Sequence, residues 1–184
     1  VLYIEWNNLY CYHENNHINF ENLDLKTFLI SGNNGMGKSS IFNIILLALW
    51  GDNLLKSQIS IINSKKNVAT TIIHVETDEE IYKIVRTFTL KEAKIIKKVI
   101  ITNLTKNVKI KEDNSSKDFI TNKIGTLDDF ITNSMITQNV DNDILKLDYK
   151  ESLLTFDKIL NLENIQKTYN LFKTTSVKYK DVIK

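Results

Sequence analysis

Residues 28 to 51, FLISGNNGMGKSSIFNIILLALWG, place three of the chain's five glycines within six positions. These are Gly32, Gly35 and Gly37. Glycine tolerates a positive φ and carries no Cβ, so the cluster predicts a tight loop whose backbone closely approaches another group. An apolar run precedes the loop, and good helix formers follow it as far as Gly51. The stretch therefore predicts a strand, a loop and a helix in that order.

The spacing of this loop matches G-x-x-x-x-G-K-[ST], the pattern of loops that cradle phosphates. We expect its backbone N–H groups and the dipole of the following helix to bind the phosphates of ATP. Lys38 would act catalytically by reaching the β- and γ-phosphates, and the Ser39 hydroxyl would ligate Mg²⁺. The predicted cofactor contacts in the loop are Gly32, Asn33, Asn34, Gly35, Met36, Gly37, Lys38, Ser39 and Ser40. The alternative is a chance match in a turn rich in Asn and Gly.

The rest of the chain predicts an α/β fold. Residues 2–9 and 18–25 favour strands, and the apolar run 27–31 predicts a strand buried on both faces. From Val68 the period of two predicts an antiparallel meander of three or four strands. Two short helices follow, the first beginning at a serine cap and ending at Gly125, and the region from 150 to 184 reads as helical.

Composition narrows the class of protein. With 184 residues, 42% of them hydrophobic and 25% charged, the chain fits one soluble globular domain with a sizeable core. No apolar window is long enough for a transmembrane helix, and no signal peptide is evident, although the chain starts at Val1. The single cysteine, Cys11, excludes an internal disulfide and suits a reducing compartment. These features favour an intracellular protein that is not secreted, and no membrane partner is expected.

Beyond the loop, several segments resemble the N-terminal half of the ATPase head of the Rad-fifty/SbcC/SMC family, an ABC-type fold. The family loop Gly-x-Asn-Gly-x-Gly-Lys-Ser/Thr-Ser/Thr is matched from Gly32 to Ser40. Residues 4–12, IEWNNLYCY, resemble its opening strand, and residues 61–88 resemble its hairpin ending in Tyr-x-apolar-x-Arg. The resemblance implies an ABC-type P-loop ATPase N-terminal lobe with an antiparallel β meander and the start of a coiled-coil helix.

The same resemblance assigns further site residues. Gln138 would be the Q-loop residue that contacts Mg²⁺ and helps to place the attacking water. Asn63 and Ser64 occupy the region where relatives touch the nucleotide. One departure is Tyr10, which stands where the family often has a basic residue that contacts phosphate. Considered alone, Gln138 would read as an exposed loop amide.

The C-terminal segment carries a heptad-like seam. Its positions are spaced alternately by four and three: Ile165, Tyr169, Phe172, Ser176, Tyr179 and Ile183. This pattern suits a coiled coil, and an ordinary amphipathic helix is the alternative. We expect residues 1–162 to form the N-terminal part of the head and residues 163–184 to begin the coiled-coil arm.

The sequence holds no apolar run that ends in Asp-Glu and no Ser-Gly-Gly motif. The resemblance implies that a C-terminal half of the same protein supplies both motifs. It also implies a homodimer with ATP sandwiched between heads, a nuclease partner of the Mre-eleven/SbcD type, and double-stranded DNA. The function implied is ATP-driven head dimerisation and hydrolysis in double-strand-break repair or recombination. The alternatives are an SMC-like ATPase that organises DNA without a nuclease and a transporter-type ABC subunit.

A lysine-rich strip in the meander could contact DNA phosphates. Its members are Lys91, Lys94, Lys97, Lys98, Lys106, Lys109 and Lys111. The alternative is a solvated hairpin whose lysines protect a sheet edge. No metal-ligand spacing is found among His13, His17 and His74.

Overall fold

The computed structural model describes residues 1–21, 27–52, 59–77, 80–112 and 116–134, together with positions 148, 150, 153, 165 and 168–173. The chain divides into two compact units, Val1–Gly125 and Thr126–Lys184.

Strict alternation of side chains builds the centre of the first unit. Strands β3 (Val68–Glu76) and β4 (Ile81–Lys91) bury every second residue, as expected for strands with one face on a core. They pair antiparallel from Val68↔Thr89 to Glu76↔Ile81. The period of two in the sequence therefore fixes which side chains enter the core.

Among the described residues, six antiparallel strands form one sheet in the order β2-β1-β3-β4-β5-β6. The other four strands are β1 (Tyr3–Asn7), β2 (Asn16–Asn19), β5 (Lys94–Asn103) and β6 (Val108–Glu112). Glu92 and Ala93 form the two-residue turn between β4 and β5, with φ of 47° and 61°. Positive φ at both positions gives a turn whose twist suits a hairpin. The predicted meander is confirmed.

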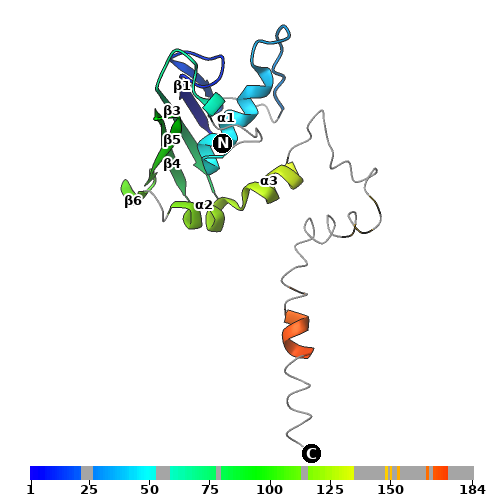
Figure 1. Ribbon diagram of the computed structural model, residues 1–184. Helices are drawn as coiled ribbons and strands as arrows, with labels where there is room; N and C mark the ends of the chain where they lie inside the picture. Colours follow the sequence, from blue (N-terminus) through cyan, green and yellow to red (C-terminus); the bar gives the residue numbers. More distant parts are fainter. Residues whose placement is uncertain are drawn as a thin grey trace, which may run out of the picture. The chain divides into compact units, whose positions relative to one another are not determined.

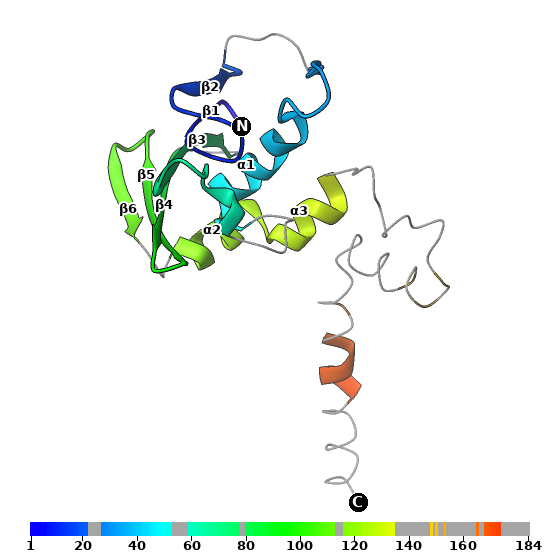
Figure 2. The same cartoon turned by 45° about the horizontal axis from the view of Figure 1, so that its top comes forward.

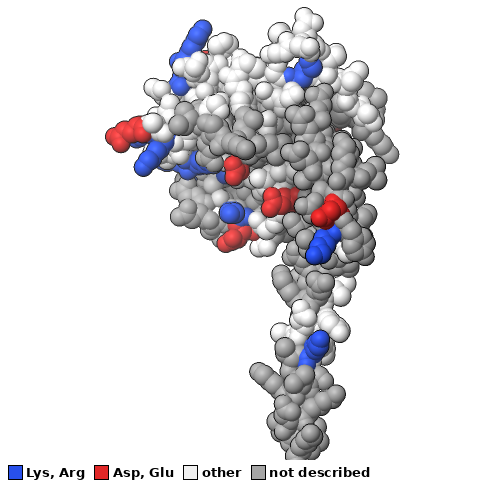
Figure 3. Space-filling view, turned by 45° about the vertical axis from the view of Figure 1, so that its right-hand side comes forward, with Lys and Arg blue, Asp and Glu red and all other residues white. Residues whose placement is uncertain are grey.

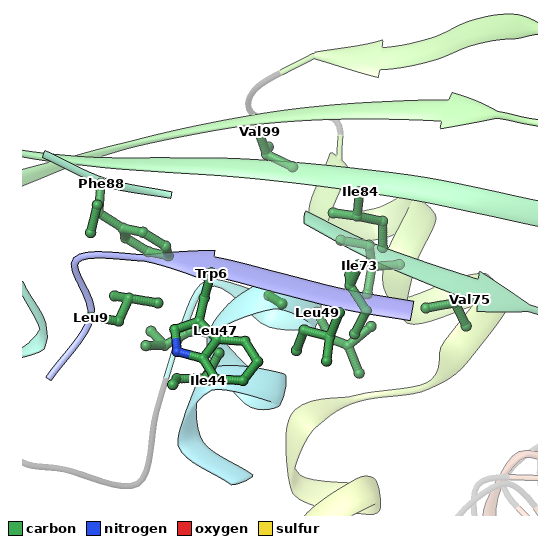
Figure 4. Packing of buried hydrophobic residues seen from close by; sticks show 14 of the residues in the cluster. Trp6, Leu9, Ile44, Leu47, Leu49, Ile73, Val75, Ile84, Phe88 and Val99 are labelled. Atoms are coloured by element: carbon green, nitrogen blue, oxygen red, sulfur yellow. The ribbon is translucent and has the colours of Figure 1, made fainter. Parts of the chain in front are cut away.

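Helix α1 (Lys38–Trp50) lies against one face of this sheet (Figures 1 and 2). The described part of the unit also contains a short 3-10 helix, η1 (Ile59–Ile61), and α2 (Ser116–Ile124). Figure 4 shows Ile44, Leu47 and Leu49 of α1 among core side chains of the strands. The core therefore lies between α1 and the inner face of the sheet.

Hydrogen bonds from two cations hold the C-terminal end of α1. Arg86, which is buried on β4, donates to the carbonyls of Ala48 at 3.0 Å and Leu49 at 2.6 Å. Lys97 donates to the carbonyl of Gly51 at 2.7 Å. Burial lowers the pKa of Arg86 to about 10, so its guanidinium is still charged at neutral pH. Cations at this end of a helix satisfy unpaired carbonyls and favour the helix dipole.

The strand predicted at 27–31 is wrong. These residues have no regular structure, and Phe28, Leu29 and Ile30 are 45%, 92% and 42% exposed. A strand buried on both faces belongs to a sheet whose two faces are covered, and this segment joins none of the strands that the structure describes. The segment is apolar, but no described part of the chain covers the side chains of Phe28, Leu29 and Ile30 enough to bury them.

The second unit begins with α3 (Leu127–Ser134). Thr126 and Asp129 form a capping box, since the Thr126 hydroxyl accepts from the Asp129 amide at 3.1 Å and the Asp129 carboxylate accepts from the Thr126 amide at 3.4 Å. Residues 168–173 are helical, and Ile165, Tyr169 and Phe172 of the predicted seam are exposed. The coiled coil and the 162/163 boundary remain predictions. None of the helices in the described part of the chain is long and apolar enough to cross a bilayer.

Candidate functional site

The glycine loop has the backbone geometry that its sequence predicts. Gly35 and Gly37 have φ of 81° and 87°, in the left-handed region that L side chains rarely adopt. Gly37 is the N-cap residue of α1, and no described side chain caps that end of the helix. The first N–H groups of α1 are therefore left without a side-chain acceptor, at the end of the helix where the dipole favours an anion.

Lys38 lies at the start of α1 with its side chain turned back over the loop. Its ammonium donates to the carbonyl oxygens of Gly32 and Asn33, both at 2.8 Å. The positive charge thus sits above the loop backbone and outside the apolar core. A phosphate bound at the N-terminus of α1 would offer this ammonium a stronger, charged acceptor in place of two neutral carbonyls.

Two neighbours of the loop were missed by sequence reasoning. A Cβ placed on Gly37 would lie 2.6 Å from the sulfur of Cys11 and 3.0 Å from the hydroxyl oxygen of Tyr12. The Tyr12 hydroxyl also donates to the carbonyl of Gly37 at 3.2 Å. Gly37 is thus required by close packing as well as by its φ. The contact joins residues 25 apart in the chain, and no local pattern predicts it.

Asn63 is buried and its side chain holds the segment that carries Tyr12. Its amide donates to the carbonyls of Tyr10 at 3.1 Å and Tyr12 at 3.3 Å, and its oxygen accepts from the Lys65 amide at 3.2 Å. The direct nucleotide contact predicted for Asn63 remains a prediction. The structure shows two hydrogen bonds that connect Asn63 to the loop, one from Asn63 to the carbonyl of Tyr12 and one from the Tyr12 hydroxyl to Gly37.

The other predicted site residues divide into two groups. Asn33, Asn34, Met36 and Ser39 are exposed around the loop, and Ser64 is exposed in the turn that follows Asn63. Gln138 lies outside the described residues, so its predicted role as a magnesium and water ligand remains a prediction. Within the described ranges, no three His, Cys, Asp or Glu residues come together as a metal site.

These residues fit a nucleotide polyphosphate. The left-handed glycines, the helix N-terminus without a side-chain cap, and the Lys38 ammonium lie together on one loop. This is the donor set that a phosphate requires. Ser39 follows on the first turn with an exposed hydroxyl, which suits an oxygen ligand of Mg²⁺.

The described lysines of the strip do not all lie on one face of the sheet, and contact with DNA remains a prediction. Lys97 points to the inner side of the sheet and binds Gly51, while Lys106 pairs with Glu80. Lys91, Lys94 and Lys98 share the opposite face by their register in the strands. On the face that Figure 3 shows, described lysines and acidic residues are interspersed. The alternating period of a strand thus divides a run of lysines between two faces.

Comparison with known proteins gives the class. A family model described as an AAA domain matches residues 3–182, nearly the whole chain. The protein is thus of the ATPase-domain class, and it belongs to this AAA domain family.

Among curated proteins, the chain is similar to the "DNA double-strand break repair Rad50 ATPase" of Thermoplasma acidophilum, with 28% identity over 165 residues. The match covers 88% of this chain and 18% of that protein, so the chain spans less than a fifth of the length of this relative. Together the two findings confirm the predicted resemblance to ATPase heads of the Rad50/SMC type.

Proposed function

We propose that this chain is the ATP-binding half of a Rad50-type, SMC-like ATPase head, and that it binds MgATP through residues 32–40. The observation that carries the proposal is the position of Lys38 over a loop of left-handed glycines at the N-terminus of α1. The loop would bind the phosphates through main-chain N–H groups, and Ser39 would ligate Mg²⁺. The metal ion, when bound, neutralises charge that develops on the phosphates.

A C-terminal half of the same protein would complete the head. The exposed apolar segment 28–30 supports this proposal, because it reads as a buried strand and finds no neighbour among the described strands. A parallel strand supplied by the other half would pair with it and cover Leu29. The missing acidic strand end and the Ser-Gly-Gly motif would come with that half, since the sequence contains neither. Catalysis of phosphoryl transfer depends on such positioned groups, so this chain alone should hydrolyse ATP negligibly.

Two such heads would sandwich two ATP molecules, and hydrolysis would release the dimer. From the resemblance and from the name of the relative, we infer a role in double-strand-break repair or recombination. Double-stranded DNA and a nuclease of the Mre-eleven/SbcD type would be the partners, and the location would be intracellular. Support for the pathway comes from the similar protein of Thermoplasma acidophilum, which is named a DNA double-strand break repair ATPase.

The test is ATP-dependent dimerisation of the complete head. Light scattering with a slowly hydrolysed ATP analogue should show a dimer for the unaltered protein and a monomer for Lys38→Ala. Lys66→Ala is the matched control, because the Lys66 ammonium forms an exposed ion pair with Glu14 at 2.8 Å. An ATP-induced dimer that persists in Lys38→Ala would refute the proposed site.

A further inference from the structure

The peptide group that joins Gly37 to Lys38 has a hydrogen-bond partner outside the loop. Its carbonyl oxygen accepts from the Tyr12 hydroxyl at 3.2 Å, as well as from the Ser40 amide of the first helical turn at 2.8 Å. Since a carbonyl can only accept, the hydroxyl of Tyr12 must donate. Burial, and then the neighbouring Cys11, raise the pKa of Tyr12, so the phenol keeps its proton at neutral pH.

The direction of this carbonyl decides the direction of the next amide. In a trans peptide the C=O and the N–H point in opposite directions. A carbonyl of Gly37 that points to Tyr12 and into α1 therefore turns the N–H of Lys38 away from Tyr12, out of the N-terminal end of the helix. That end is the proposed phosphate site. The Ser40 amide holds this carbonyl from the helix side, and Tyr12 adds a second donor at a residue that has no side chain to restrict its backbone.

Tyr12 is itself held in place from two directions. Its ring packs edge-on against buried Trp6, with centroids 5.3 Å apart and an interplanar angle of 81°. Its own carbonyl accepts from the Asn63 amide at 3.3 Å. The neighbouring backbone is tied to the same region, because Tyr10 N–H donates to Ile61 O at 2.8 Å. The ring contact and these main-chain hydrogen bonds support the Tyr12 hydroxyl where it donates to Gly37.

We propose that Tyr12 is a positioning residue of the phosphate loop, which orients the Gly37–Lys38 peptide so that the Lys38 amide donates to a bound polyphosphate. This inference rests on the proposed function. Tyr12 would act through the backbone and would touch neither the base nor the sugar. Its contribution should therefore be the same for any ligand that carries the polyphosphate.

The experiment compares Tyr12→Phe with Tyr3→Phe in the complete head. Tyr12→Phe keeps the ring that packs on Trp6 and removes only the donor. Tyr3→Phe is the matched control, because it also removes one hydroxyl hydrogen bond, which Tyr3 of β1 donates to Glu5 at 2.8 Å. Dissociation constants are measured by calorimetry for MgATP and for magnesium tripolyphosphate, and the Tm of each variant is recorded.

We expect Tyr12→Phe to raise both dissociation constants by the same factor, about three- to tenfold, which is the effect of one lost hydrogen bond. Its Tm should fall no further than that of Tyr3→Phe, whose affinities should not change. Equal affinities in Tyr12→Phe and the unaltered protein would overturn the inference and leave the proposed function intact. A loss for ATP alone would also overturn it, since Tyr12 would then contact the nucleoside. If the unaltered protein binds neither ligand, the proposed function itself fails.

Discussion

Replacing Gly37 by alanine should be far more harmful than replacing Gly35, although both glycines have nearly the same backbone conformation. Their φ values are 87° and 81°, so alanine at either position should cost about 1 kcal/mol for the left-handed backbone. At Gly35 the new Cβ meets nothing within 4 Å. At Gly37 it would lie 2.6 Å from Cys11 Sγ and 3.0 Å from the Tyr12 hydroxyl, and such crowding adds about 1–3 kcal/mol.

The free energy of unfolding should therefore fall by about 1 kcal/mol in Gly35→Ala and by about 2–4 kcal/mol in Gly37→Ala. Urea unfolding followed by tryptophan fluorescence measures both, since Trp6 is buried in the core and Trp50 lies in α1. Adding Cys11→Ala to Gly37→Ala should recover part of the loss by removing the closest atom. Equal losses in the two glycine variants would refute the packing of Cys11 and Tyr12 on the loop.

Two further predictions concern the sheet. Arg86→Met should lower the free energy of unfolding by about 2–3 kcal/mol, because it removes two charge-assisted hydrogen bonds to α1. Urea unfolding measures this loss, and Arg86→Lys should lose less. An Arg86→Met variant as stable as the unaltered protein would contradict the role of Arg86 at the C-terminal end of α1. Burial, and then Lys83, lower the pKa of His74. The unfolded chain then binds protons more readily, so stability should fall as the pH drops below about 6.5. Tm profiles of His74→Gln should be flatter in that range; an unchanged slope would contradict the burial of His74.

The sequence predicts well those helices and strands whose ends and buried faces are marked by residues within the element or directly beside it. Helix α1 is bracketed by glycines at 37 and 51, and both are its observed caps. Buried and less buried residues alternate along β3 and along β4 from Ile81 to Thr89, so the buried faces follow from the period of two. In α1, β3 and β4, residues close together in the sequence are enough to predict the type of element and its approximate bounds.

Long-range contacts could not be predicted in the same way. The apolar run 27–31 indicates burial, but a strand also needs a partner edge, and sequence periodicity does not say where that edge is. The contact of Tyr12 with Gly37 and that of Arg86 with the end of α1 join residues 25 and 37–38 apart in the chain. Such contacts have no repeating pattern, and they become visible only when α1 is placed on the sheet.

The most direct test of the account is a structure of the complete head with MgATP or a slowly hydrolysed analogue. It should show the β- and γ-phosphates at the N-terminus of α1, within hydrogen-bond distance of main-chain N–H groups of residues 35–39. The ammonium of Lys38 should have left the carbonyls of Gly32 and Asn33, to which it donates here at 2.8 Å, for a phosphate oxygen. A nucleotide bound elsewhere, with Lys38 still on those two carbonyls, would contradict the central claim.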